Sequence, residues 1–418
     1  MGGKPLKDNN FTFIHCSDLH LGRNFSHREQ IDQKVFDYIL NSSYESFKNI
    51  VRDAIKFNID FMVISGDVFD TISHKLKAQL FLKEQFEKLN NHGINVYMIH
   101  GNHDPIEEWK RNIEFPKNVY TFPPDKIETY EFKKGNETLA KISGISYARS
   151  DVQENLSLKF EVKKEDFFNI AILHSNVGGI KGLDNYAPAS VNDLIYKNFD
   201  YWALGHYHKN TILKENPYIV YPGTTQGLSI NENGVKGYYL VKVYNKNTEI
   251  EFKKSSVLEW EVLPINTEGI DTLDLLLNNL SKEINKIKNE IPKILRIVLT
   301  GHTALHNDLT EDNLNDILMK FREAEIEEEN FVWIESIKNN TKPEIELEEL
   351  KRENDFISKF IDNYVNSEEN FEDLLSTDNS YPRLKKYIKM FSEEEKKEIL
   401  ENSMIDGIDY LRGEKYEN

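Results

Sequence analysis

Five short apolar runs in the first 245 residues each end in a polar cluster, and this pattern constrains the fold more than any other feature. The clusters read SDLH, GDVFD, GNHD, LHSN and GHYH. Segments with helical spacing of apolar residues lie between some of the runs, at 44–57 and 76–89. This alternation is typical of an α/β sheet whose parallel strands are buried on both faces. Such sheets bind ligands at the carboxyl ends of their strands, so we expect the clusters to meet.

The clusters supply imidazole, carboxylate and side-chain amide groups, which together indicate a metal site. The predicted ligands are Asp18, His20, Asp67, Asn102, His174, His206 and His208. Seven ligands exceed what one ion with open positions uses, so we expect two ions that share a bridging carboxylate. Nitrogen and oxygen donors without a thiolate suit manganese, iron or zinc better than calcium. Two metals about 3.5–4 Å apart favour attack on a phosphate ester.

Each cluster taken alone also has an ordinary explanation. The stretch GNHDP contains the turn formers Gly, Asn, Asp and Pro, and a single Asp-x-His pair has little specificity. His206 and His208 are two residues apart, so an extended chain would point both rings to one side. All five clusters in order, each after a predicted strand, favour the metal site. In this interpretation Asn102 is a neutral ligand and His103 faces the substrate.

The remaining sequence predicts two further domains after a first domain at residues 1–245. Residues 246–343 are expected to form a small α+β domain, and residues 344–418 an acidic helical segment. The strands expected in the second domain lie near 249–252, 260–264, 294–300 and 331–337, and its helices at 272–290 and 310–324.

The composition excludes a basic nucleic-acid coat protein, because the formal net charge is −18. More than half of this excess lies in residues 344–418, so an anion-binding site in the first domain stays open. No run approaches the roughly 20 apolar residues of a membrane helix, and the start lacks the apolar region of a secretory signal. The single cysteine, Cys16, fits a reducing cytoplasm. We therefore expect a cytoplasmic protein with no membrane partner.

The series D-x-H, G-D-x-x-D, G-N-H-D, H and G-H-x-H resembles the calcineurin-like metallophosphoesterase superfamily over residues 11–245. The stretches DFMVISGDVFD, VYMIHGNHD, YWALGHYH and YPGTTQG are similar to its DNA-repair exonuclease branch, which includes SbcD and YhaO-like nucleases. The glycine-rich stretch after His174, with Tyr186-Ala187-Pro188, is especially similar to the YhaO-like members. The resemblance implies a β-sandwich flanked by helices, followed by a small α+β capping domain and a helical segment that binds an SbcC-type ATPase.

The resemblance also implies a role for each candidate residue. It places Asp18, His20 and His208 on one metal, Asn102, His174 and His206 on the other, and Asp67 between them. It makes His103 the group that stabilises the transition state or protonates the leaving 3′-oxygen, with Asp104 orienting its ring. Some relatives have histidine where this chain has Asp70, so we expect Asp70 to support the site rather than act directly.

The predicted function is a two-metal DNA exonuclease or endonuclease in DNA end processing or repair. By resemblance manganese is the expected metal, with magnesium, iron or zinc as alternatives. The expected partners are DNA and an SbcC-type coiled-coil ATPase, and a homodimer stays open. One alternative is a metallophosphoesterase acting on a small phosphodiester or a phosphoprotein. Another is a non-catalytic scaffold that binds metal without turnover.

Overall fold

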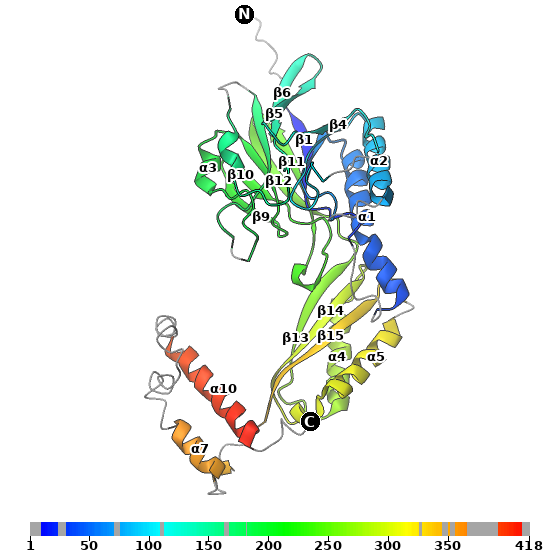
Figure 1. The fold of residues 1–418 in the computed structure, drawn as a ribbon. Coiled ribbons are helices and arrows are strands. Elements are labelled where there is room, and N and C mark those ends of the chain that lie inside the picture. Colours follow the sequence, from blue (N-terminus) through cyan, green and yellow to red (C-terminus); the bar gives the residue numbers. More distant parts are fainter. Residues whose placement is uncertain are drawn as a thin grey trace, which may run out of the picture. The chain divides into compact units, whose positions relative to one another are not determined.

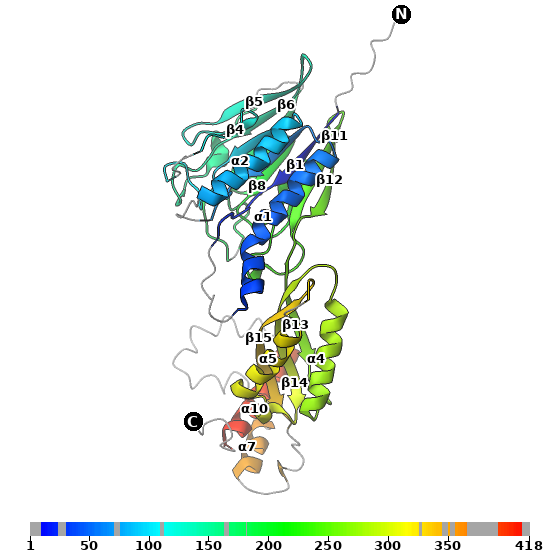
Figure 2. The same ribbon diagram turned by 90° about the vertical axis from the view of Figure 1, so that its right-hand side faces the viewer.

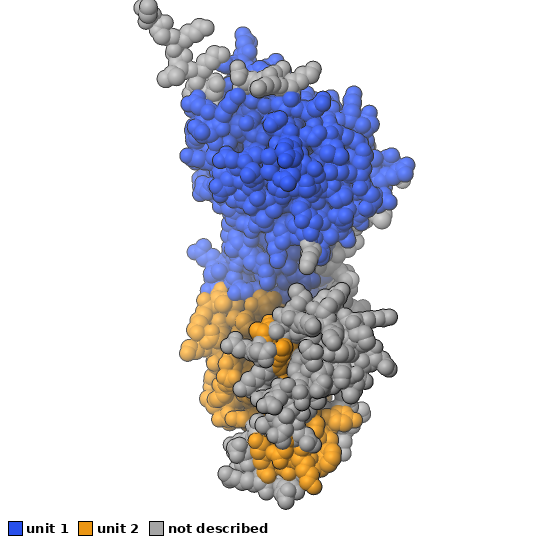
Figure 3. All heavy atoms as spheres, turned by 90° about the vertical axis from the view of Figure 1, so that its left-hand side faces the viewer, with its two compact units in different colours: residues 1–261, 288–295, 325–333 blue, residues 262–287, 296–324, 334–418 orange. Residues whose placement is uncertain are grey.

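The structure, a computed structural model, describes residues 10–23, 31–70, 76–108, 113–162, 167–180, 182–325, 328–344, 350–351, 356–365 and 392–411. The chain divides into two compact units (Figure 3). Unit 1 comprises Met1–Glu261, Lys288–Leu295 and Glu325–Trp333, and unit 2 comprises Val262–Ile287, Arg296–Ala324 and Ile334–Asn418. The domain boundaries after residues 245 and 343 stay predictions. No helix in the described ranges is long and apolar enough to cross a membrane.

Unit 1 is built on two six-stranded sheets (Figure 1). The first contains, in spatial order, β12 (Asn247–Lys254), β11 (Gly237–Tyr244), β1 (Phe11–Cys16), β2 (Phe61–Ser65), β3 (Asn95–Ile99) and β4 (Val119–Thr121). Strands β1 to β4 run parallel, whereas β11 is antiparallel to both of its neighbours. The parallel strands therefore end together at one edge of the sheet.

The second sheet repeats this arrangement with antiparallel strands at both edges. It contains, in order, β5 (Glu128–Lys134), β6 (Glu137–Gly144), β7 (Phe168–His174), β8 (Tyr201–Gly205), β10 (Tyr218–Tyr221) and β9 (Thr211–Glu215). Strands β6, β7, β8 and β10 are parallel, and β5 and β9 pair antiparallel with them.

The two sheets pack face to face around an apolar core rich in aromatic rings. Phe13 and Phe61 stack with ring centroids 5.0 Å apart, and Tyr201 from the second sheet meets Phe13 edge-on at 5.3 Å. Helices α1 (Gln33–Lys56) and α2 (Leu76–Asn91) cover the outer face of the first sheet (Figure 2). The outer face of the second sheet carries the short helices η2 (Leu156–Lys159) and α3 (Val191–Ile195). The predicted α/β sandwich flanked by helices is confirmed.

Helix α1 begins earlier than the apolar spacing at 44–57 predicted. Asp32 caps it by accepting hydrogen bonds from the backbone N–H groups of Lys34 and Val35. The first turns bury Val35 and Ile39 in a separate apolar cluster, together with residues such as Leu258 and Trp260. The apolar spacing did not predict these first turns, because their apolar residues pack in this separate cluster and not on the sheet that the rest of α1 covers.

Strand β12 is part of the first sheet, whereas the sequence placed a strand near 249–252 in the second domain. It pairs with β11 over its whole length, from Tyr244 opposite Asn247 to Gly237 opposite Lys254. Only residues 245 and 246 connect the two strands, and such a two-residue hairpin places β12 next to β11 in the same sheet.

Unit 2 contains most of a three-stranded sheet and its helices. The sheet has the order β13 (Glu259–Asn266), β14 (Lys293–Thr303) and β15 (Val332–Pro343). Helices α4 (Leu273–Ile287) and α5 (Glu311–Glu325) lie beside it (Figures 1 and 2). The short helix η4 (His306–Asp308) precedes α5. Helices α7 (Phe356–Val365) and α10 (Glu393–Leu411) pack on each other through Ile361, Met404 and Ile408. The division into an α+β domain and a helical segment stays a prediction, and of the predicted segment at 344–418, residues 345–349, 352–355, 366–391 and 412–418 lie outside the described residues.

Candidate metal centre

The predicted ligands all lie at or just past the carboxyl ends of parallel strands. Three strands of the first sheet and two of the second supply them. Asp18 and His20 follow β1, Asp67 follows β2, Asn102 follows β3, His174 ends β7, and His206 and His208 follow β8. Face-to-face packing of the sheets brings these five ends together.

Four of these residues have a positive φ angle, a backbone conformation that residues other than glycine rarely adopt. The φ angles are 52° at Asp18, 44° at His20, 50° at Asp67 and 97° at His206. Left-handed φ values in non-glycine residues cost free energy and concentrate at functional sites. The backbone N–H groups of Asp18 and His20 donate to the carbonyls of Gly66 and Asp67, at 3.1 Å each, which holds the two turns against each other.

Two glycines let the strand ends approach closely. A Cβ on Gly101 would lie 2.2 Å from Asp67 Oδ1, and one on Gly205 would lie 2.0 Å from the Ser65 carbonyl oxygen. Such distances are far shorter than a van der Waals contact, so only glycine fits. The glycines of GNHD and GHYH are therefore required by the approach of the strands and not by the turn alone.

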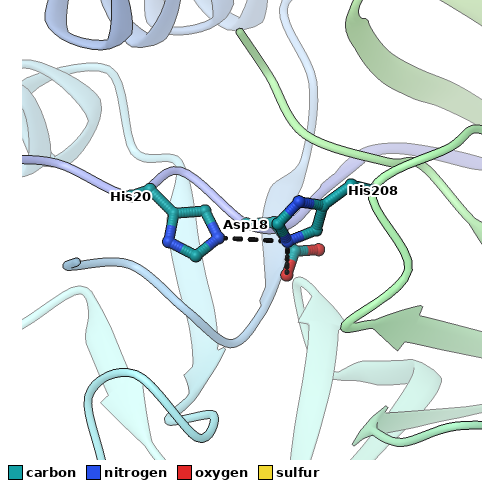
Figure 4. Close-up of side chains that lie close together, drawn as sticks. All are labelled: Asp18, His20 and His208. Carbon is teal, nitrogen blue, oxygen red and sulfur yellow. Dashed lines mark hydrogen bonds and ion pairs between the residues drawn. The ribbon is translucent and has the colours of Figure 1, made fainter. Parts of the chain in front are cut away.

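The first group of candidate ligands consists of Asp18, His20 and His208 (Figure 4). His20 Nε2 lies 3.2 Å from His208 Nε2, and His208 Nε2 lies 3.8 Å from Asp18 Oδ1. Their ligand atoms all fall within 4.8 Å of one another. Two imidazole nitrogens and one carboxylate oxygen at this spacing can share one cation.

The second group is centred on His174. Its Nε2 lies 3.4 Å from Asp67 Oδ2 and 3.0 Å from Asn102 Oδ1. Asp67 Oδ2 is also 4.0 Å from His20 Nε2, so this oxygen lies between the two groups. It is buried and has no hydrogen-bond partner among the described residues. An orphaned buried carboxylate oxygen between two sets of ring nitrogens fits a bridge between two cations.

His206 contacts the first group through its backbone N–H, and its ring is the remaining candidate ligand of the second group. Its backbone N–H donates to both carboxylate oxygens of Asp18, at 3.1 and 3.2 Å. Its Nε2 lies 2.8 Å from the Asp184 carbonyl oxygen, which can only accept. The neutral ring therefore carries its proton on Nε2, which leaves Nδ1 with a lone pair for a metal. Burial lowers the pKa of His206 to about 4, so the ring is neutral near pH 7.

The charges of the site also fit divalent cations. The carboxylates of Asp18 and Asp67 are 1% and 0% exposed, and buried carboxylates need compensating positive charge. Burial would raise the pKa of Asp67, but His174, His103 and His20 lower it well below its usual value. Burial would also lower the pKa of His174, but the charge of Asp67 raises it to about 9. A bound dication would supply the charge that a proton on His174 otherwise provides.

Comparison with known proteins agrees with this geometry. Residues 11–210 match the family of calcineurin-like phosphoesterases, and residues 260–342 match the middle domain of the metallophosphoesterase YhaO. A Bacillus subtilis (strain 168) protein described as metallophosphoesterase YhaO is 35% identical over 94% of this chain and 96% of its own length. The chain belongs to the YhaO family of calcineurin-like metallophosphoesterases. The predicted resemblance is confirmed.

More distant relatives of this YhaO-family chain carry a name that refers to DNA. A protein of Sulfurisphaera tokodaii described as DNA double-strand break repair protein Mre11 is 26% identical over 72% of this chain and 76% of its own. A protein of Methanocaldococcus jannaschii with the same description is 25% identical over 66% of this chain and 74% of its own.

Hydrogen-bonded outer partners fix the orientation of two histidines in the YhaO-family site. His174 Nδ1 lies 2.8 Å from the Ser65 carbonyl oxygen, and His208 Nδ1 lies 2.9 Å from Glu232 Oε1. In these two rings Nδ1–H faces an acceptor, which leaves Nε2 for a metal. His20 Nδ1 lies 3.3 Å from Asp70 Oδ1 but makes no hydrogen bond within the described residues.

The sequence did not point to Glu232. It lies in the short helix η3 (Ile230–Glu232), far along the chain from every cluster. Burial would raise the pKa of Glu232, but the hydrogen bond from His208 lowers it. The only available signal was the general need of a ligating histidine for a carboxylate or carbonyl partner.

The expectation that Asp104 orients His103 is wrong. Both oxygens of Asp104 accept backbone N–H groups instead, from Val68 at 3.0 Å and Gly101 at 2.8 Å. Asp104 is fully buried and holds the loops after β2 and β3 together. Its carboxylate therefore points toward the backbone N–H groups of Val68 and Gly101 and not toward the ring of His103.

Asp70 lies beside His103 in place of Asp104. Its Oδ1 is 3.4 Å from His103 Nδ1, and the same oxygen faces His20. The supporting position expected for Asp70 agrees with this geometry. His103 also donates its backbone N–H to Asp67 Oδ1 at 2.9 Å, and its side chain is 32% exposed. Burial lowers the pKa of His103 more than Asp67 raises it.

The metal centre opens into a cleft of about 360 Å³. Five residues of the predicted site line this cleft: Asp67, Asn102, His103, His206 and His208. The cleft lining also includes Lys209, Asn231, Glu232 and Lys236. The structure thus brings the seven predicted ligands together, with His103 beside them and room for a substrate. Their individual roles stay predictions.

Proposed function

We propose that this protein is a two-metal phosphodiesterase that hydrolyses DNA. The observation that carries the proposal is Asp67 Oδ2, a buried oxygen without a hydrogen-bond partner between the nitrogens of His20 and His174. Asp18, His20 and His208 would hold one cation, and Asn102, His174 and His206 the other. Two divalent cations would polarise the scissile phosphate and make hydroxide available near neutral pH.

The protein's own residues would orient the substrate and move a proton. His103 has Nδ1 toward Asp70, so Nε2 would face the cleft, where the leaving 3′-oxygen needs a proton. Asp70 would position the ring through the contact at 3.4 Å. Imidazole suits this step because its ordinary pKa lies near neutrality.

DNA as the substrate is supported by the relatives described as DNA double-strand break repair proteins. The resemblance to the DNA-repair exonuclease branch adds manganese as the metal and an SbcC-type ATPase as the partner. On α7 and α10, Phe356 is 70% and Tyr410 64% exposed, which suits a docking surface for such a partner. A cytoplasmic location, proposed from the lone Cys16, agrees with DNA as the substrate and with an SbcC-type ATPase as the partner.

A small phosphodiester is the second candidate, and the net charge of −18 favours it. Polyanionic DNA is repelled by an acidic surface, whereas a small ester carries little charge. We therefore expect DNA binding by the isolated protein to be weak and to fall as salt rises.

The test combines metal analysis with hydrolysis assays. The purified protein is loaded with manganese, magnesium or zinc and assayed on linear DNA and on a bis-aryl phosphodiester. We expect DNA cleavage with manganese, its loss in His103→Ala, and no effect of His92→Ala, a control histidine that is exposed just after the end of α2. Hydrolysis of the small ester without DNA cleavage at any salt concentration would favour the second candidate. If the protein binds metal but hydrolyses neither substrate, the result would support the alternative of a non-catalytic metal-binding scaffold.

A further inference from the structure

One wall of the cleft carries donors that neither the metal centre nor the proposed chemistry uses. Lys209, Asn231 and Lys236, here called the lysine wall, all line the cleft beside His206 and His208. Lys209 follows His208 directly in the sequence, and Lys236 precedes β11. Two segments far apart in the chain therefore supply this wall, and both belong to unit 1.

Lys236 is the unusual member of the lysine wall. It is only 6% exposed, yet its Nζ donates just one hydrogen bond within the described chain, to the His208 carbonyl oxygen at 3.1 Å. An ammonium group has three donors, and a buried charge is costly unless it is paired. A role limited to tying His208 to β11 would account for one donor and leave the other two unsatisfied.

The neighbouring carboxylate does not pair with Lys236. Glu232 Oε1 accepts from His208 Nδ1 at 2.9 Å, and Oε2 accepts from the Leu228 backbone N–H at 3.1 Å. Among the residues that the structure describes, no carboxylate lies within ion-pair distance of Lys236 or Lys209. Glu232 is committed to orienting a metal ligand, so Lys236 keeps its charge for the cleft.

Lys209 adds a second positive charge at the same wall. Both Lys209 and Lys236 line the cleft beside His208, and no described carboxylate is paired with either of them. Like charges held together beside a cleft are stabilised when an anion binds between them.

We propose that the lysine wall binds a second phosphate of the substrate, next to the phosphate held at the metal centre. The proposal rests on the proposed function, because it takes the metal centre as the site of the scissile phosphodiester. Lys236 would donate its free N–H groups to the phosphate oxygens, Asn231 its amide, and Lys209 would add charge. Substrates with neighbouring phosphates, such as a polynucleotide, are then preferred over an isolated diester.

The experiment measures binding without turnover. Thymidine 3′,5′-bisphosphate, thymidine 5′-monophosphate and thymidine 3′-monophosphate are titrated calorimetrically into the full chain loaded with manganese. We expect the bisphosphate to bind about tenfold more tightly than either monophosphate, as a charge-assisted hydrogen bond gives. Lys236→Gln should remove most of this preference. Lys209→Gln should reduce it about threefold at low salt and less at high salt, because exposed charges are screened.

Two controls keep the result interpretable. Lys214→Gln, on the edge strand β9 and outside the cleft lining, should leave the preference unchanged. Lys236→Gln is checked for metal stoichiometry and thermal midpoint, and the exposed Lys209→Gln decides the question if that variant misfolds.

Equal binding of bisphosphate and monophosphates to the wild type, or no binding of either, overturns the proposal. So does a preference that survives in both Lys209→Gln and Lys236→Gln. The outcome is distinct from that of the proposed function. A bisphosphate preference without DNA cleavage would keep the phosphate site and reject the nuclease, and DNA cleavage without the preference would do the reverse.

Discussion

Replacing Glu232 by glutamine tests how the protein orients His208. The two carboxylate oxygens each accept one N–H group, from His208 Nδ1 at 2.9 Å and from the Leu228 backbone at 3.1 Å. Glutamine has one oxygen and one NH₂ group, so in either orientation one of these donors faces another donor. The side chain at this position is only 14% exposed, so water replaces the lost acceptor poorly.

The size of the effect follows from this mismatch. Leaving a part-buried donor unpaired costs about 1–3 kcal/mol, and loss of an outer partner of a ligating histidine typically weakens metal binding about 10–100-fold. The two ranges agree, since about 1.4 kcal/mol corresponds to a factor of ten. Only the site that contains Asp18, His20 and His208 should weaken, because Glu232 contacts His208 alone among the predicted ligands.

The assay is calorimetric titration of manganese into metal-free protein at neutral pH, fitted to two sites. Glu215→Gln is the matched control, because Glu215 is exposed on β9 and does not line the cleft. We expect one of the two affinities to fall in Glu232→Gln and both to stay unchanged in Glu215→Gln. Two affinities that remain within about twofold of the wild type would refute the reasoning, since the outer-partner effect is about 10–100-fold.

Three further predictions follow from the same geometry. Asp67→Asn should lower the manganese content from two ions to at most one and reduce hydrolysis by about a thousandfold, as loss of a two-metal site would; mass spectrometry of the metals and a diester assay check this. Gly101→Ala should abolish metal binding in a destabilised protein, because its Cβ would lie 2.2 Å from Asp67 Oδ1 and 2.9 Å from His174; a normal thermal midpoint with both metals bound would contradict it. Burial lowers the pKa of His15 from 6.5 to about 3, so the unfolded chain binds more protons in this window and stability falls as pH drops from 6.5 toward 3. The thermal midpoint of metal-free His15→Gln should therefore depend less on pH there than that of the wild type, and parallel curves would count against this.

The candidate ligand set could be proposed from the sequence because each part of it is local in the sequence. An apolar run followed by Asp-x-His or Gly-Asn-His-Asp states both the strand and the groups at its end, and parallel strands end at a common edge. The seven candidate ligands could therefore be proposed without knowledge of the tertiary structure. The role of Asp104 could not be read in the same way. Its neighbour in sequence is His103, but its hydrogen-bond donors come from Val68 and Gly101.

The sequence by itself determined the family, the alternation of strands and helices, and the chemical groups of the metal site, because these depend on short-range order. Only the tertiary structure decided which groups stand behind the ligands: Glu232 behind His208, Asp70 beside His103, and the Asp184 carbonyl at His206. Such partners come from loops that are distant along the chain, and their approach depends on how the two sheets pack. A hydrogen bond depends on distance and direction in space, which residue order specifies only through the complete fold.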